Sequence, residues 1–203
     1  MKKLIIPIAI LLTSITLSSF TLLFDPLPIG SDMPKADKKL KDVSGKEVTL
    51  KDAKKQNGLL VMFSCNTCPF VIMNQKRTQE ICTYAESKNF GVVILNSNEA
   101  NRNGVDSYDE MKLYAKEQNY NWNYLVDADS ELANAFGANR TPECFLFNKD
   151  LKLVYHGAID NNPSNAENVT RKHLQIALDE TVEGKNVTMN ETKSVGCGIK
   201  RKA

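Results

Sequence analysis

The chain is poor in several residue types that would define its fold by themselves. It has five cysteines in 203 residues, too few for a disulfide-bonded scaffold, so the packing of apolar side chains must supply the core. It has two histidines and lacks both a second Cys-x-x-Cys and a His-x-x-x-His motif, which structural zinc sites usually contain. It also lacks a glycine-rich phosphate-binding loop. The sequence therefore implies no metal, nucleotide or flavin cofactor.

An excess of charge of one sign is also missing. The 26 basic residues nearly balance the 24 acidic ones, and the small difference disappears without Lys2 and Lys3. Such a surface gives no argument for binding nucleic acid or anionic membranes. The mixed composition, 42% hydrophobic and 25% charged, is typical of a soluble globular protein. The length is sufficient for one domain of ordinary size.

Residues 1–24 differ from the rest of the chain. Lys2 and Lys3 precede an apolar run from Leu4 to Phe24, which is the layout of a secretory signal. The run is also roughly long enough to span a bilayer, so an uncleaved N-terminal anchor is the alternative. Both predictions place the domain outside the cytoplasm, in the periplasm, either secreted or tethered. A cysteine pair stays reduced there only if a partner keeps it so.

The pattern of apolar runs and turns predicts a linker at 25–37 and one α/β domain at 38–200. The predicted elements are a hairpin at 40–50, a short helix at 51–55, a strand at 58–64, a helix at 70–90, a strand at 91–96, helices at 107–117 and 130–136, a hairpin at 143–156 and a helix at 167–183. Strands that alternate with helices predict a parallel core sheet, to which the second hairpin adds antiparallel strands. We expect helices on both faces of this central mixed sheet.

Cys65-Asn66-Thr67-Cys68-Pro69 joins the first predicted buried strand to the long predicted helix. The first sulfur would lie at a helix N-terminus, where unpaired N–H groups and the helix dipole favour the thiolate. Cys68 would lie about one turn further on, close enough to attack a mixed disulfide formed at Cys65. The motif indicates redox chemistry. Half of a structural zinc site and a static disulfide are the alternatives.

The remaining candidate residues give weaker signals. Thr141-Pro142 precedes an apolar strand, and the proline either opens that strand or forms a cis bond in a tight turn. Cys82 and Cys144 are predicted to be small buried residues of a helix and a core strand. Cys197 is either an incidental thiol near the C-terminus or a third redox cysteine, if the tail folds back over the Cys65 end.

These features together resemble the thioredoxin superfamily. Residues from about 58 to 200 are similar to its exported redoxin subgroup, the AhpC/TSA-like and thioredoxin-like proteins with a Cys-Asn-x-Cys-Pro motif. The matching blocks are Cys65–Val71, Leu95–Asn98, Tyr124–Asp127, Phe136–Ala138, Thr141-Pro142, Phe145–Phe147, Gly157–Asp160 and Gly196–Lys200. The resemblance implies a thioredoxin-like fold, with the first predicted hairpin as an N-terminal extension.

The resemblance also implies roles for individual residues. Cys65 would be the nucleophile that attacks a substrate disulfide, and Cys68 the resolving thiol. Thr141 and Pro142 would bind substrate, with Pro142 in a cis peptide bond and the backbone of its neighbours free to pair with a bound peptide. The block around Cys197 favours a role for this cysteine in the site.

Thr67 departs from the subgroup, which usually carries histidine at this position. A cationic imidazole would stabilise the Cys65 thiolate, whereas a hydroxyl stabilises it only weakly. We therefore expect a less oxidising cysteine pair than the histidine version would give. This favours a reductase over a disulfide-forming oxidase.

The predicted function is thus a thiol–disulfide oxidoreductase that reduces protein disulfides and receives electrons from a membrane or periplasmic donor. A peroxiredoxin-like peroxidase is the alternative from the same superfamily, but the signature Pro-x-x-x-Thr-x-x-Cys fails at both Cys65 and Cys68. A redox-inactive module that binds peptides at the sheet edge beside Pro142 is the alternative from another class.

Overall fold

The computed structural model describes residues 24–202. The predicted signal or anchor therefore lies outside the described residues, apart from Phe24. None of the helices within residues 24–202 has the length and apolar character that a membrane-spanning segment needs.

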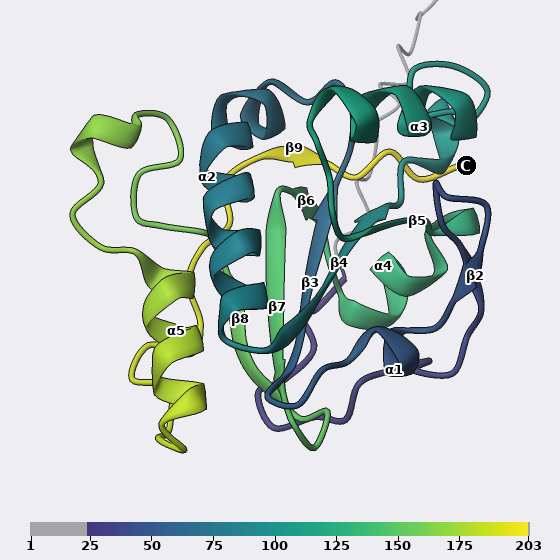
Figure 1. Cartoon of the computed structure of the whole chain (residues 1–203). Coiled ribbons are helices and arrows are strands. Elements are labelled where there is room, and N and C mark those ends of the chain that lie inside the picture. Colours follow the sequence, from purple (N-terminus) through teal and green to yellow (C-terminus); the bar gives the residue numbers. More distant parts are fainter. Residues whose placement is uncertain (1–23, 203) are drawn as a thin grey trace, which may run out of the picture.

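A five-stranded mixed sheet forms the centre of the protein (Figure 1). Its strands, in spatial order, are β5 (Asn123–Val126), β4 (Phe90–Asn96), β3 (Gly58–Ser64), β7 (Glu143–Asn148) and β8 (Leu153–Gly157). β3, β4 and β5 are parallel, whereas β7 runs antiparallel to β3 and β8 antiparallel to β7. The parallel core with an antiparallel hairpin at one side is the predicted arrangement, which the structure confirms.

The alternation of side chains along the central strands builds two apolar cores, one on each face of the sheet. In β3, Leu60 and Met62 belong to the first core. Leu59, Val61 and Phe63 belong to the second. Because successive residues of a strand point to opposite faces and both faces are covered, every residue of β3 and of β4 is buried.

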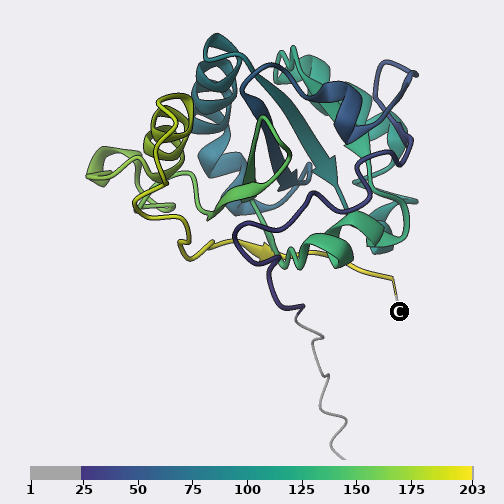
Figure 2. The same ribbon diagram turned by 90° about the horizontal axis from the view of Figure 1, so that it is seen from below.

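Helices cover both faces, as predicted. The first core is covered by α2 (Pro69–Ser87), α3 (Tyr108–Glu117) and α5 (His173–Val182). The second is covered by α1 (Leu50–Ala53), α4 (Glu131–Phe136) and the hairpin of β1 (Leu40–Lys41) and β2 (Glu47–Val48). Short 3-10 helices are η1 (Glu99–Asn101), η2 (Ala128–Ser130) and η3 (Ala166–Asn168). α2 and α5 lie side by side in the view of Figure 1 and in the view from below in Figure 2.

The segment predicted to be a linker, 25–37, is attached to the domain by backbone hydrogen bonds. Leu27 N–H donates to the carbonyl of Phe136 at the end of α4, and Gly30 N–H donates to the carbonyl of Leu153 in β8. Met33 is buried in the second core. The domain thus begins to pack before residue 38.

The last helix is shorter than predicted, because a side chain binds the backbone amides that would have formed its first turns. We predicted a helix over 167–183, but α5 begins at His173. The side-chain carbonyl of Asn161 accepts hydrogen bonds from the N–H groups of Thr170 and Arg171. These residues are therefore held in a loop. Gly184, with a φ of +70°, lies just beyond the helix end, as expected for a left-handed terminating residue.

Three other details differ from the prediction. β5 is an edge strand of four residues that the sequence pattern does not predict. α2 ends at Ser87 rather than at residue 90, because Asn89 takes a left-handed conformation with a φ of +59°. α4 begins at Glu131 rather than at residue 130. Ser130 is its N-cap residue without a capping hydrogen bond, and the carboxylate of Asp127 accepts from the N–H groups of Leu132 and Ala133.

Candidate active site

The two cysteines of the Cys-x-x-Cys motif lie where β3 ends and α2 begins. β3 ends at Ser64, so Cys65 follows the strand directly, and Cys68 is the N-cap residue of α2. Pro69 is the first residue of the helix, where the missing N–H of proline costs no hydrogen bond. The chain therefore fixes both sulfurs at the positive end of a 19-residue helix.

Thr141, distant in sequence, is brought against both sulfurs. Its hydroxyl oxygen lies 3.6 Å from Cys65 Sγ. Cys68 Sγ lies 3.3 Å from the carbonyl oxygen of Thr141, to which the thiol donates whenever Cys68 is protonated. The Thr141–Pro142 peptide bond is cis, as the family resemblance implied. All five cysteines lie within the described residues and are free thiols, so the site is in its reduced form.

The two thiols of the motif share one negative charge. The hydrogen bond from Cys65 lowers the pKa of Cys68 to about 4, against the opposing effect of burial, with further help from the Cys197 thiol and the amide of Val71. The same hydrogen bond and burial raise the pKa of Cys65 above its ordinary value. We expected the resting thiolate on Cys65. The directions of these two shifts favour the thiolate at Cys68, the N-cap residue, with the remaining proton held at Cys65.

We predict that the reduced protein carries one motif thiolate from about pH 5 to pH 8, seen as ultraviolet thiolate absorbance that is lost as the pH falls through about 4. The unfolded chain keeps this proton up to the ordinary thiol pKa of 9.0. The reduced protein should therefore gain stability as the pH rises from about 4 towards 9, and lose it as the pH falls. An absorbance midpoint near 9 in the folded protein would contradict the shared charge.

The C-terminal tail forms part of the site rather than hanging free. A short strand, β9 (Cys197–Gly198), pairs antiparallel with β6 (Arg140–Thr141), so that Cys197 is opposite Thr141. β9 runs past the N-terminal end of α2 (Figure 1), and Cys197 packs against Cys65 and Cys68. This corrects one expectation. The backbone beside Pro142 is not free for a bound peptide, because the protein's own tail is paired with it.

A buried polar network holds the loop between the cysteines, and sequence analysis did not identify it. Its centre is Asp106, which is 0% exposed. The carboxylate accepts hydrogen bonds of 2.8–3.2 Å from the backbone N–H of Asn66 and from the side-chain amides of Asn96, Asn98 and Asn101. Tyr124 donates from its hydroxyl to the side chain of Asn66. The backbone N–H and the side chain of Asn66 are thus both held by hydrogen bonds. This holds the loop between the cysteines and, with it, the spacing of the two sulfurs. The only sequence signal was the density of Asn and Asp in 96–106.

A comparison with protein families identifies the family to which a chain with this site belongs. Residues 28–170, well over half of the chain, match the family described as Redoxin. The chain belongs to the redoxin family. The comparison with curated proteins finds no match.

Two solved structures resemble this redoxin over nearly its whole length. An uncharacterized conserved protein from Geobacillus kaustophilus is 36% identical, with a TM-score of 0.81, and the match covers 89% of this chain and 96% of that one. A hypothetical protein from Sinorhizobium meliloti 1021 is 32% identical, with a TM-score of 0.80, covering 90% of this chain and 100% of that one.

A more distant structure confirms the fold. A putative protein disulfide isomerase from Bacteroides thetaiotaomicron is 14% identical, with a TM-score of 0.57, over 80% of this chain and 95% of that one. The redoxin therefore has the predicted thioredoxin-like α/β fold. Family, fold and the buried dithiol together assign thiol-based redox chemistry to it in general terms.

The other two cysteines of the redoxin lie away from the site. Cys82 and Cys144 are both 0% exposed in the first core, as predicted. Burial raises the pKa of both thiols, so they are inert at neutral pH. Within residues 24–202, no group of three His, Cys, Asp or Glu side chains is placed to hold a metal ion.

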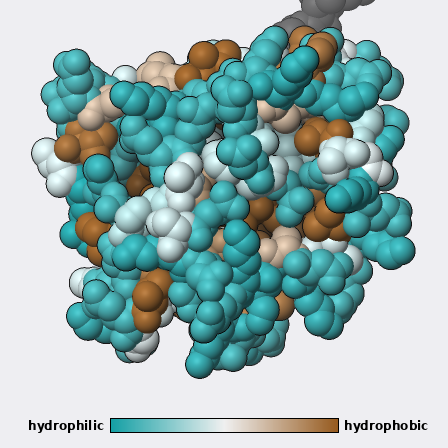
Figure 3. Space-filling view, in the orientation of Figure 1, coloured by the Kyte–Doolittle hydropathy of each residue, from teal (hydrophilic) through white to brown (hydrophobic). Residues whose placement is uncertain are grey.

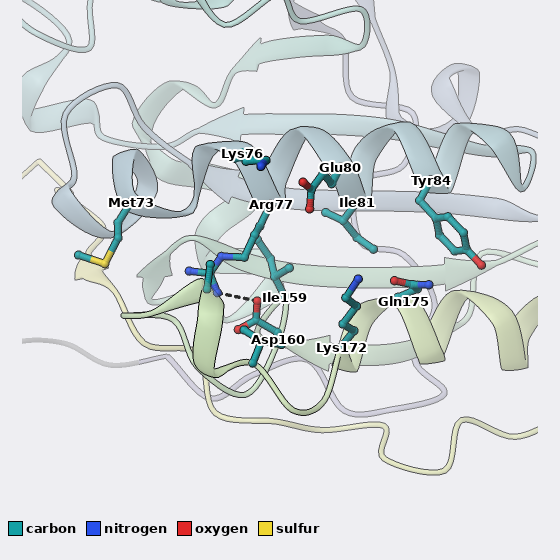
Figure 4. A pocket seen from close by; sticks show the side chains of 12 residues that line it. Met73, Lys76, Arg77, Glu80, Ile81, Tyr84, Ile159, Asp160, Lys172 and Gln175 are labelled. Carbon is teal, nitrogen blue, oxygen red and sulfur yellow. Dashed lines mark hydrogen bonds and ion pairs between the residues drawn. The ribbon is translucent and has the colours of Figure 1, made fainter.

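A cleft of about 610 Å³ lies on the flank of α2, between this helix, α5 and the loop after β8 (Figure 4). Met73 lies at the end of the cleft that faces the start of α2. On the loop side, Arg77 Nη1 donates to Asp160 Oδ2 over 2.6 Å. Arg77 also binds the carbonyls of Asn162 and Pro163. These contacts hold the loop after β8 against α2. The same loop borders a small hollow that Pro142 also lines.

Apolar side chains are exposed around the motif. Ile72 and Met73 project from the beginning of α2 and are 58% and 50% exposed, and Val195, just before β9, is 38% exposed. Val195 also lines a small hollow together with Pro142 and Asn74. The face of the molecule in Figure 3 is largely hydrophilic, with small separate apolar patches.

Proposed function

We propose that this redoxin is a thiol–disulfide oxidoreductase that reduces protein disulfides outside the cytoplasm, with Cys65 and Cys68 as its dithiol. The observation that carries the proposal is the position of the two sulfurs at the start of α2, both in contact with Thr141. The hydrogen bond between the sulfurs lowers the pKa of Cys68 and raises that of Cys65, which favours one thiolate at neutral pH. Cys82 and Cys144 have no such environment.

In the proposed cycle, the proton of Cys65 moves across the hydrogen bond to Cys68, and the Cys65 thiolate attacks one sulfur of the substrate disulfide. The other substrate sulfur leaves as a thiolate and takes up the proton that Cys68 then releases. The Cys68 thiolate attacks the Cys65 sulfur, which frees the second substrate thiolate. The substrate is thereby reduced by two electrons, and the Cys65–Cys68 disulfide is reduced in turn by a donor dithiol.

The surface around the motif supports a polypeptide as the substrate. Ile72 and Met73, in the first turns of α2, and Val195, just before β9, expose apolar surface, and Pro142 lines a small hollow together with Val195. We propose that the substrate contacts this side of Pro142, since the backbone of Thr141 is paired with the tail.

Two features of the sequence support the proposed direction of electron flow and location. Thr67 is exposed and has a neutral hydroxyl where the similar subgroup usually carries histidine, so no cationic imidazole at this position stabilises the Cys65 thiolate. This favours a reductase. The basic and apolar run at 1–24, outside the described residues, supports export or an N-terminal anchor. The electron donor is then a membrane or periplasmic dithiol.

The proposal predicts that Cys68→Ser traps substrates, because a mixed disulfide at Cys65 then lacks its resolving thiol. The full-length variant is incubated with a disulfide-bonded test protein, and the products are separated without reductant. A mixed disulfide should accumulate with Cys68→Ser. None should accumulate with the double variant Cys65→Ser, Cys68→Ser, which is the matched control.

Alkylation of the wild-type protein across a glutathione series completes the test. Cys65 and Cys68 should become protected together, as one two-electron couple. A pair that never cycles would leave only the redox-inactive peptide-binding module. Rapid sulfenic acid formation with peroxide, without trapped protein, would favour the peroxidase instead.

A further inference from the structure

A third thiol touches the redox pair. Cys197 packs against the cluster formed by Cys65, Cys68 and Val71. The thiols of Cys65 and Cys197 both lower the pKa of Cys68, and burial together with Cys68 raises the pKa of Cys197. Cys68 is therefore the middle member of three sulfurs. Cys65 and Cys68 are 2% and 4% exposed, whereas Cys197 is only half-buried.

The tail is built to hold Cys197 in this place. Cys197 and Gly198 pair with Thr141 and Arg140. After them, Ile199 N–H donates to the carbonyl of Asn139 over 3.1 Å, and Lys200 N–H donates to the side chain of Asn98 over 2.8 Å. Asn98 also donates to Asp106, so the network that fixes the Cys65–Cys68 loop is tied to the tail.

A glycine before Cys197 allows the close approach of the tail. A Cβ atom on Gly196 would lie 2.1 Å from the carbonyl oxygen of Thr141, whereas a Cβ on Gly198 would meet nothing within 4 Å. The tail can therefore dock only if residue 196 has no side chain, whereas residue 198 could carry one. A tail that merely covered the surface would not need this approach.

We propose that Cys197 is a third redox thiol, which exchanges the Cys65–Cys68 disulfide for a Cys68–Cys197 disulfide. In this step the Cys197 thiolate attacks the Cys68 sulfur, the Cys65–Cys68 bond breaks, and Cys65 leaves as a thiolate. No electrons are gained or lost, and the proton lost by Cys197 is taken up by Cys65 or the solvent. The inference rests on the proposed function, because that function forms the first disulfide.

After the exchange, the substrate and the electron donor react with different cysteines of the site. Cys65 is freed beside the apolar substrate surface, while the oxidised bond moves to the more accessible sulfur. A donor dithiol attacks Cys197, Cys68 leaves as a thiolate, and the second donor thiol displaces Cys197 from the mixed disulfide. Two electrons thus pass from the donor to the site through the tail, with the donor oxidised to its own disulfide.

Disulfide mapping of the full-length protein tests this directly. Wild type, Cys65→Ser and Cys197→Ser are oxidised with oxidised glutathione, quenched with acid, alkylated in denaturant, and mapped by mass spectrometry. Wild type should yield both Cys65–Cys68 and Cys68–Cys197 peptides. Cys65→Ser should yield the Cys68–Cys197 peptide almost completely. Cys68 and Cys197 that stay separate in Cys65→Ser, while wild type forms Cys65–Cys68, would overturn the inference and leave the proposed function intact.

Two glycine variants test whether the exchange requires the docked tail or only the presence of the Cys197 thiol. Gly196→Ala should lower the yield of the Cys68–Cys197 bond about tenfold or more, and Gly198→Ala should leave it unchanged. Dithiothreitol, as the donor probe, should reduce the oxidised wild type about tenfold faster than oxidised Cys197→Ser. Equal reduction rates, or equal yields in the two glycine variants, would contradict the relay. A wild type with no Cys65–Cys68 bond would instead defeat the proposed function itself.

Discussion

Replacing Cys65 by serine is expected to lower disulfide reductase activity by about a thousandfold or more, as loss of a nucleophile does in other enzymes. A serine hydroxyl stays protonated near neutral pH and does not displace sulfur. Cys68 does not take over, because its sulfur is held against the carbonyl of Thr141 and the thiol of Cys197. The measurement is the initial rate of reduction of a peptide disulfide by the full-length protein, with a dithiol as regenerating donor.

Cys82→Ala is the matched control for removal of a thiol. Cys82 lies on the same helix as the site but is buried in the first core, away from the three clustered sulfurs. It should keep its activity within about twofold and lose at most about 1–2 kcal/mol of stability. If Cys65→Ser retained more than a tenth of the wild-type rate, Cys68 would be the attacking thiol, and the thiolate on Cys68 in the resting site would be the nucleophile itself.

The sequence predicts those parts of the fold that are determined by residues close together in the chain. The buried strand β3 has the predicted bounds, 58–64, because a short apolar run between turn residues specifies it. α3 ends at Glu117, as predicted, and begins one residue later than predicted, because Ser107 caps it by accepting from the N–H of Glu110. Before α5, the side chain of Asn161 accepts hydrogen bonds from the backbone of Thr170 and Arg171. No local sequence pattern predicts such a contact.

The same distinction applies to the site. The Cys65–Cys68 motif is contiguous, so its position at a strand–helix junction follows from periodicity alone. Which of the two sulfurs holds the proton does not follow from a local pattern, because the Cys65–Cys68 hydrogen bond, burial and the distant Thr141 and Cys197 all shift the two pKa values. The pairing of β9 with β6 also depends on long-range contacts, and two-residue strands have no periodicity to detect. A family block identified Cys197 as worth attention without giving its place.

Replacing Asp106 by alanine is expected to destabilise the domain by about 3–5 kcal/mol, because it leaves several buried donors without an acceptor. For a domain of this size, the unfolding midpoint should fall by about 6–20 °C. Asp109→Ala is the control. Its carboxylate is 84% exposed and pairs only with Lys112 at the surface, so the loss should be below about 1 kcal/mol. Thermal unfolding followed by circular dichroism measures both.

The activity of Asp106→Ala distinguishes a structural network from one that also positions the sulfurs. Asp106 fixes the backbone N–H of Asn66, which lies between the two cysteines. Well below the unfolding midpoint, the variant should lose about tenfold to a hundredfold in disulfide reduction, because small displacements of reacting groups are costly. The absorbance midpoint of the motif thiolate should also rise, since the Cys65–Cys68 hydrogen bond depends on this loop. A destabilised variant with a normal rate and midpoint would confine Asp106 to holding the fold.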